Sequence, residues 1–129
     1  MNILGIDYGE KKIGLAVGYT DSKFAEPLMV VRYKDESKAI ERIFQIALVE
    51  KASKVVIGIS ERKTAEKTRD FGSKLALELK MPIEYHDETL STREAQELSR
   101  DAGMKRKKRK DMEDAFAASL MLQKHLEEN

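Results

Sequence analysis

The sequence predicts an α/β fold with one five-stranded mixed sheet, built from an antiparallel three-strand meander and two parallel strands, and flanked by helices on both faces. Three observations predict this fold. Short apolar segments open the chain, helical periodicity first appears near Ser37, and a continuous apolar run at 54–59 separates two helical segments. With 129 residues, 41% hydrophobic and 36% charged, the chain is expected to form a single domain over residues 1–129.

Three strands are expected at the start of the chain. They cover Ile3–Tyr8, Ile13–Tyr19 and Pro27–Tyr33, and Gly9–Lys12 supplies the turn between the first two. Because the connections are short, these strands should form an antiparallel meander.

Helices and strands then alternate. Ser37–Glu50 carries apolar residues at helical spacing, and Lys54–Ile59 is typical of a strand that is buried on both faces. A second helix is expected from about Ala65 to Lys80, and Pro82–His86 should form a short fifth strand. Strands joined through a helix are parallel, which places the fourth and fifth strands beside the first strand rather than beyond the hairpin.

Two further helices are expected nearer the C-terminus. The segment Ser91-Thr92-Arg93-Glu94 fits a capping box, so a helix should begin at Ser91 and end at Gly103. Asp111 is expected to cap the last helix. The apolar face of that helix should consist of Met112, Ala115, Phe116, Ser119, Leu122 and Leu126.

Positive charge is concentrated in one segment. The unbroken basic run consists of Lys105, Arg106, Lys107, Lys108, Arg109 and Lys110. Removing these six charges from the formal net charge of +1 leaves −5 for the rest of the chain. Such a run fits a solvated linker, but it directly precedes two acidic residues and would also hold a phosphate backbone beside them.

Composition excludes several kinds of protein. The chain has no cysteine, so it has no disulfide framework and no thiolate metal site or nucleophile. Neither a signal peptide nor an apolar run of about 20 residues is present, so a cytosolic protein without membrane contact is expected. Periodicity alone leaves the oligomeric state open between a monomer and a weak homodimer.

Asp7 and Glu88 are the first candidates for a functional site. Asp7 interrupts an apolar strand near its carboxyl end, where open α/β sheets place their ligands. Glu88 follows the fifth strand and would emerge at the same edge of the sheet if the two strands are parallel. The alternative is that Asp7 only satisfies amide groups of the following turn.

Asp111 and Asp114 are three residues apart at the start of the last helix, which puts both carboxylates on one face. Either could be structural, because acidic residues stabilise the first turn of a helix. Carboxylates gathered from several elements repel one another, and Mg²⁺ or Mn²⁺ relieves that repulsion. Two such ions can hydrolyse a phosphodiester without histidine ligands, so His86 and His125 receive no catalytic role.

Three motifs of this chain resemble the YqgF family in order and spacing. They are Ile6-Asp7-Tyr8-Gly9 with the following Lys11–Val17, Asp87-Glu88-Thr89-Leu90-Ser91-Thr92, and Asp114-Ala115-Phe116-Ala117-Ala118. The resemblance runs nearly end to end. It implies a ribonuclease H-like fold and a nuclease related to Holliday-junction resolvases, described as maturing the 5′ end of pre-16S ribosomal RNA.

The resemblance also implies roles for individual residues. Asp7, Glu88 and Asp114 would be the catalytic metal ligands for Mg²⁺ or Mn²⁺, with Asp111 as a fourth carboxylate, and residues 105–110 would contact nucleic acid. The expected partners are therefore ribosomal RNA precursors, ribosomal particles or branched DNA. The chain departs from the family after the fourth strand: members usually continue with Gly-Leu-Pro and a glycine-containing loop, whereas here Gly58-Ile59-Ser60 leads into the short, charged segment Glu61–Thr64.

Two other classes of function compete with a nuclease. The Asp7 segment also resembles the first phosphate loop of actin-like ATPases and sugar kinases, but those proteins bind nucleotide between two such domains. A nucleic-acid-binding module with little or no catalysis is the second alternative. Retention of all three acidic residues favours the nuclease.

Overall fold

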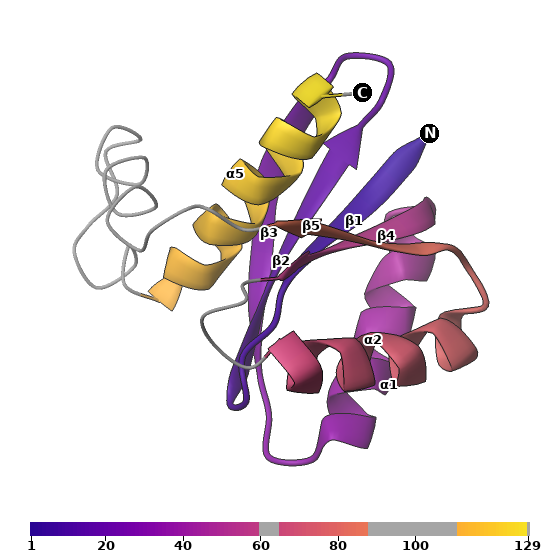
Figure 1. Cartoon of the computed structure of the whole chain (residues 1–129), viewed down its shortest axis with the longest axis vertical. Coiled ribbons are helices and arrows are strands. Elements are labelled where there is room, and N and C mark those ends of the chain that lie inside the picture. Colours follow the sequence, from indigo (N-terminus) through magenta and orange to yellow (C-terminus); the bar gives the residue numbers. More distant parts are fainter. Residues whose placement is uncertain (60–64, 88–110, 129) are drawn as a thin grey trace.

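A computed structural model describes residues 1–59, 65–87 and 111–128. In chain order the elements are β1 (Asn2–Asp7), β2 (Lys12–Tyr19), β3 (Phe24–Arg32), α1 (Glu36–Val49), β4 (Ala52–Ile59), α2 (Ala65–Leu79), β5 (Ile83–Asp87) and α5 (Glu113–Glu128), as labelled in Figure 1. The helix expected from Ser91 to Gly103, the basic run 105–110 and the loop 60–64 lie outside the described residues.

The five strands form one sheet in the order β3-β2-β1-β4-β5. Strands β1, β2 and β3 pair antiparallel, whereas β1 pairs parallel with β4 and β4 pairs parallel with β5. The predicted meander and the placement of both later strands on the β1 side are therefore confirmed. Right-handed crossovers require this arrangement, because α1 and α2 connect parallel strands across one face of the sheet.

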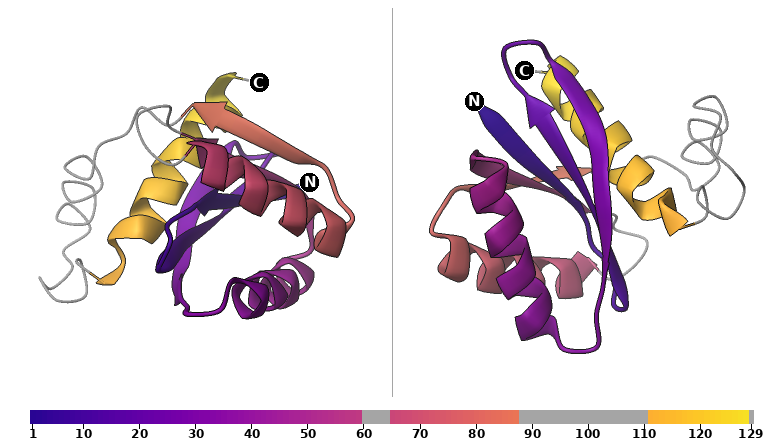
Figure 2. Two further views of the ribbon diagram at one scale, coloured as in Figure 1. Left: turned by 60° about the horizontal axis from the view of Figure 1, so that its bottom comes forward. Right: turned by 180° about the vertical axis from the view of Figure 1, so that it is seen from behind.

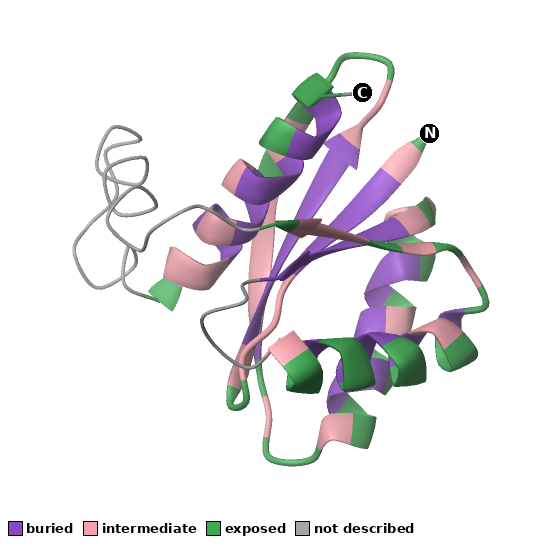
Figure 3. Ribbon diagram, in the orientation of Figure 1, coloured by how far each residue is buried: buried purple, intermediate pink, exposed green. Residues whose placement is uncertain are grey.

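The larger hydrophobic core lies between the sheet and the helices α1 and α2. Leu4 and Ile6 of β1 and Ile57 of β4 point into this core, where they meet Ile43 of α1 and Phe71 of α2. Figure 3 shows buried residues along the central strands and on the inner sides of both helices. Helix α1 begins where Asp35 accepts a hydrogen bond from the Ser37 amide at 3.0 Å.

The smaller core lies under α5 on the opposite face of the sheet (Figure 2). Ile3, Val56 and Leu122 are among its buried members. Glycines let this helix approach the strands closely, because a Cβ at Gly18 would lie only 2.8 Å from Leu122 Cδ2. Helices therefore cover both faces, as the sequence predicts.

The boundaries of two elements differ from the predictions. β3 begins at Phe24, three residues before the expected start at Pro27, because it pairs with β2 as far as Tyr19. Asp111 was expected to cap the last helix, but α5 begins at Glu113 and the Met112 carbonyl accepts the hydrogen bond of the Phe116 amide at 3.0 Å. The helix thus starts one residue later than a cap at Asp111 predicts, which would make Met112 its first residue.

Candidate active site

Asp7 lies at the carboxyl end of β1, between two glycines of the neighbouring strands. In the sheet register it pairs with Gly14 of β2 and with Gly58 of β4. Side chains alternate along a strand, and Ile6 enters the larger core, so Asp7 projects from the face that α5 covers. Neither neighbour has a side chain, so no strand side chain covers this half-buried carboxylate from the paired positions.

Asp114 lies in the first turn of α5, directly over Gly14. A Cβ at Gly14 would collide with the backbone carbonyl of Asp114, so this residue must be glycine for the helix to sit where it does. Paired residues in an antiparallel ladder are about 5 Å apart at Cα. Gly14 therefore brings Asp114 close to Asp7, although the two are far apart in sequence.

Lys12 provides positive charge beside these carboxylates. Its Nζ lies 3.1 Å from Asp114 Oδ2, and the two side chains are 41% and 26% exposed. An ammonium group at this position offsets the repulsion between converging carboxylates. Its position at the start of β2 places it two residues before Gly14, on the same face of the strand.

Aromatic residues fix the loop that follows Asp7. The Tyr8 ring packs against Phe71 with ring centroids 4.6 Å apart, and its hydroxyl donates to Glu36 at 3.1 Å. The Tyr33 hydroxyl donates to the Gly9 carbonyl at 2.5 Å. Burial, together with hydrogen bonds to Tyr33 and Glu36, raises the pKa of Tyr8 well above its usual value. Its hydroxyl therefore stays protonated and keeps its hydrogen bond to Glu36.

Asp111 lies farther out than Asp114. Its Oδ1 is 3.7 Å from Arg32 Nη2, and both side chains are more than half exposed. A pair with this exposure and distance contributes little to stability. Asp111 is thus placed near the N-terminal end of α5, where an arginine of β3 reaches it.

Glu88 and the basic run 105–110 fall outside the described residues, but the strand that leads to Glu88 is described. β5 ends at Asp87, which pairs with Ile59 at the carboxyl end of β4. The carboxyl ends of β1, β4 and β5 therefore meet at one edge of the sheet, as the parallel arrangement predicts. Across residues 1–59, 65–87 and 111–128, no three acidic or histidine side chains are gathered closely enough to hold a metal ion.

The described donors nevertheless fit a hard divalent cation. Asp7 and Asp114 supply carboxylate oxygens, which Mg²⁺ and Mn²⁺ prefer. Sequence reasoning missed the roles of Lys12 and Gly14. The signal for Gly14 was present, since an isolated glycine within a strand often marks close approach of another backbone.

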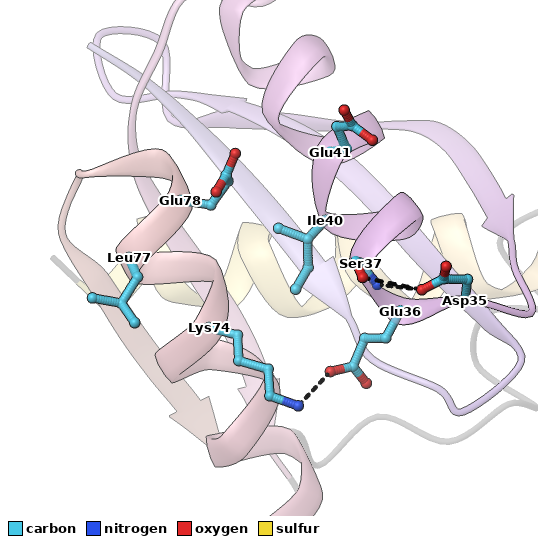
Figure 4. A pocket seen from close by; sticks show the side chains of 8 residues that line it. All are labelled: Asp35, Glu36, Ser37, Ile40, Glu41, Lys74, Leu77 and Glu78. Atoms are coloured by element: carbon cyan, nitrogen blue, oxygen red, sulfur yellow. Dashed lines mark hydrogen bonds and ion pairs between the residues drawn. The ribbon is translucent and has the colours of Figure 1, made fainter.

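A separate groove lies between α1 and α2. It has a volume of about 630 Å³ and is lined by Asp35, Glu36, Ser37, Ile40, Glu41, Lys74, Leu77 and Glu78 (Figure 4). Lys74 is held in it by Glu36 at 3.3 Å. This groove is on the face opposite α5, so it is separate from the carboxylates of Asp7 and Asp114.

None of the described helices is long and apolar enough to cross a membrane.

Comparison with known proteins gives one family. The family model RuvX, described as Holliday junction resolvase, matches residues 1–128. A protein of Lactococcus lactis subsp. lactis (strain IL1403), provisionally named a pre-16S rRNA nuclease, is 35% identical, with 97% of this chain and 93% of the relative covered. A relative with the same name from Caldanaerobacter subterraneus subsp. tengcongensis is 36% identical, with 98% of this chain and 96% of the relative covered.

Solved structures show the same fold. RuvC of Thermus thermophilus in complex with a Holliday junction substrate matches with a TM-score of 0.64 at 17% identity, covering 99% of this chain and 94% of that chain. The Fowlpox virus resolvase bound to Holliday junction DNA matches with a TM-score of 0.64 at 12% identity, covering 99% and 98% of the two chains. The predicted ribonuclease H-like architecture is therefore confirmed.

Proposed function

This chain belongs to the RuvX family of Holliday junction resolvases, which is the YqgF family of the sequence resemblance, and from that membership we propose that it is a metal-dependent hydrolase of phosphodiester bonds in structured nucleic acid. The proposed substrate is the 5′ end of pre-16S ribosomal RNA, because the sequence relatives carry that name. Its catalytic and metal-binding residues are Asp7, Glu88 and Asp114, with Asp111 as a further candidate ligand.

The observation that carries this proposal is the approach of Asp114 to Asp7 over Gly14. The two residues come from opposite ends of the chain, and a backbone contact that only glycine permits brings them together. A purely turn-capping Asp7 would not require a second carboxylate on its open side. The convergence therefore supports catalysis over a structural role for Asp7.

Each described residue has a distinct part in the proposed reaction. Asp7 and Asp114 would hold Mg²⁺ or Mn²⁺, which supplies activation of water and stabilisation of the leaving oxygen. The Lys12 ammonium beside Asp114 offsets negative charge and can attract a phosphate oxygen. Tyr8 and Tyr33 hold the loop after β1, so the Asp7 carboxylate keeps its position when substrate binds.

Branched DNA is the second candidate substrate, because the family is described as a resolvase family. A binding module with little catalysis is a candidate of another class. We propose that residues 1–129 form one nuclease domain, which is a monomer or a weak homodimer. It would act in the cytoplasm on ribosomal RNA precursors or ribosomal particles. The basic run 105–110 is proposed to contact the nucleic acid.

The proposed function is tested by cleavage of a structured pre-16S RNA fragment and a four-way DNA junction in Mg²⁺ or Mn²⁺. Asp7→Asn and Asp114→Asn should each reduce the cleavage rate at least 100-fold, since a lost carboxylate weakens the metal site. Glu78→Gln removes the same charge in the groove between α1 and α2 and should leave the rate unchanged. Equal rates for all four proteins would contradict the assignment, and binding without cleavage would favour the binding module.

A further inference from the structure

A second groove lies at the end of β3, where the chain turns into α1. It has a volume of about 300 Å³ and is lined by Val31, Arg32, Tyr33, Lys34, Asp35, Lys38, Ala39 and Arg42. Four of these eight residues are cationic and one is acidic. The acidic residue, Asp35, is occupied with the start of α1, because its Oδ1 accepts from the Ser37 amide and hydroxyl at 3.0 and 3.1 Å.

The cations of this groove are not neutralised by neighbouring acids. Lys34, Lys38 and Arg42 are exposed and form no ion pair with any residue that the structure describes, and Arg32 has only the 3.7 Å contact to Asp111. Lys38 and Arg42 are four residues apart on α1. Like charges at that spacing destabilise a helix, so the arrangement has a cost that a bound anion would remove.

The groove lies at the same edge of the sheet as the carboxylates. Asp7 pairs with Gly14, and Gly14 pairs with Val30, which is two residues before Arg32. β3 is two strands from β1, which corresponds to roughly 10 Å at about 4.8 Å per strand. Lys12 bridges this interval, because it pairs with Arg32 in the sheet and its ammonium contacts Asp114.

A cationic path therefore leads from the acidic site around the edge strand. It begins at Lys12, continues through Arg32 and Lys34, and reaches Lys38 and Arg42 on α1. A nucleic-acid strand carries about one phosphate per 3.4 Å of helix axis, so roughly 10 Å corresponds to about three phosphates. This interval spans the distance from Asp7 to Arg32, and Lys38 and Arg42 continue the cationic path beyond it onto α1.

We propose that this groove, formed by Arg32, Lys34, Lys38 and Arg42, binds the phosphate backbone of the nucleic acid on one side of the cleaved bond. The inference rests on the proposed function, in that it takes the cleaved phosphate to lie at Asp7 and Asp114. It adds a second phosphate-binding surface, far in sequence from the basic run 105–110 and built on β3 and α1. Contacts of this kind position a substrate without reading its bases.

The test compares two double variants that lose the same charge. Lys38→Gln/Arg42→Gln removes two groove cations. Lys51→Gln/Lys80→Gln removes two exposed lysines, one directly before β4 and one three residues before β5, at the end of the sheet opposite Asp7. Binding of a fluorescein-labelled four-way DNA junction and of a structured pre-16S RNA fragment is followed by anisotropy in EDTA over a series of salt concentrations.

The slope of log K against log salt is negative, and the groove variant should make it about 1.8 less negative for duplex arms. Each lost phosphate contact removes about 0.9 from its magnitude. The control variant should keep the wild-type slope. In Mg²⁺, the groove variant should raise KM while kcat stays within about twofold, because the carboxylates are untouched. Thermal unfolding of both variants checks that neither substitution disturbs the fold.

Failure of the inference and failure of the proposed function give different results. If the wild type cleaves, Asp7→Asn does not, and both double variants keep the wild-type slope, the groove does not bind the backbone. An equal loss in both double variants also overturns the inference, because it reports overall charge. If only the groove variant loses slope but no protein cleaves either substrate, binding of the backbone by the groove stands, whereas its placement beside a cleaved bond and the nuclease assignment both fail.

Discussion

Gly14 links the sheet to the helix that carries Asp114. The absence of a side chain lets the first turn of α5 rest on β2, with the Asp114 carbonyl where a Cβ would otherwise be. The contact is with backbone, which cannot rotate away as a side chain can. The missing methyl group of Gly14 thus sets how closely the backbone of Asp114 approaches β2.

Gly14→Ala should destabilise the fold by about 1–3 kcal/mol, the usual cost of inserting a methyl group into a packed contact, and should abolish most cleavage. Urea unfolding and the cleavage assay measure both effects. Gly18→Ala is the matched control on the same strand, because its Cβ would meet the flexible side chains of Leu122 and Leu126. If both variants lose activity equally, close packing of α5 rather than the placement of Asp114 is responsible.

Among single residues, sequence patterns identified Asp7 and Asp114 but not their surroundings. An acidic residue that ends an apolar strand is visible in the sequence alone. The partners Lys12, Tyr33 and Gly58 are not, because each reaches the site through the strand register, and a register is defined only once strands pair.

Helix α5 is attached to the sheet by polar as well as apolar contacts. His125 Nδ1 lies 3.4 Å from His86 Nδ1 of β5, and the two rings meet edge to face. His125 Nε2 lies 3.5 Å from Glu84, which Lys54 holds at 2.9 Å, and Glu128 lies 3.8 Å from His86. His125 is buried, although it was not among the residues predicted for the apolar face of this helix.

This contact should make stability depend on pH. Burial first, and then Lys54 and His86, lower the pKa of His125 below its ordinary 6.5. As pH falls through 6.5, the unfolded chain binds a proton that the folded chain does not, so the free energy of unfolding decreases until the folded pKa is reached. Stability is therefore highest above pH 6.5 and lost below it.

Urea unfolding between pH 7.5 and about pH 5 measures this effect, and His125→Gln should flatten the dependence. The carboxylate of Glu84 titrates in a lower range, because Lys54 lowers its pKa below 4.5. An unchanged pH dependence in the variant would contradict the assignment of the effect to His125.

The elements themselves were largely predictable, and their ends were not. β4 stood out as a continuous apolar run, and the structure buries Val55–Ile59. The extra residues of β3 before Pro27 are half-exposed or exposed, so their apolar pattern is weak. The start of α5 was misplaced because Asp111 fits a cap locally, whereas the structure places it beside Arg32.

At the scale of the whole molecule, one sheet separates two hydrophobic cores, and the candidate site lies on the α5 side. The order β3-β2-β1-β4-β5 follows from chain connectivity, so it could be predicted before any side chain was placed. The position of α5 could not, because no short connection fixes it. Packing of its buried residues against small residues of β1 and β2 decides it.

Metal binding should stabilise the entire fold. Mg²⁺ or Mn²⁺ at Asp7 and Asp114 would bind the folded chain and not the unfolded one, which adds about 2.7 kcal/mol at one hundred times the dissociation constant. The melting temperature should rise with metal concentration in the wild type and stay constant in Asp7→Asn. NaCl at equal ionic strength is the control, and an equal rise in the variant would place the binding elsewhere.

The arrangement of the sheet and α5 also has a consequence for protein synthesis. All five strands leave the ribosome before Glu113–Glu128, so a nascent chain can form the meander and the larger core while its glycine-lined face is still bare. Asp114 reaches Asp7 only when the final helix docks. The proposed catalytic site therefore cannot assemble until translation has delivered α5, so a nascent chain that lacks this helix should be inactive.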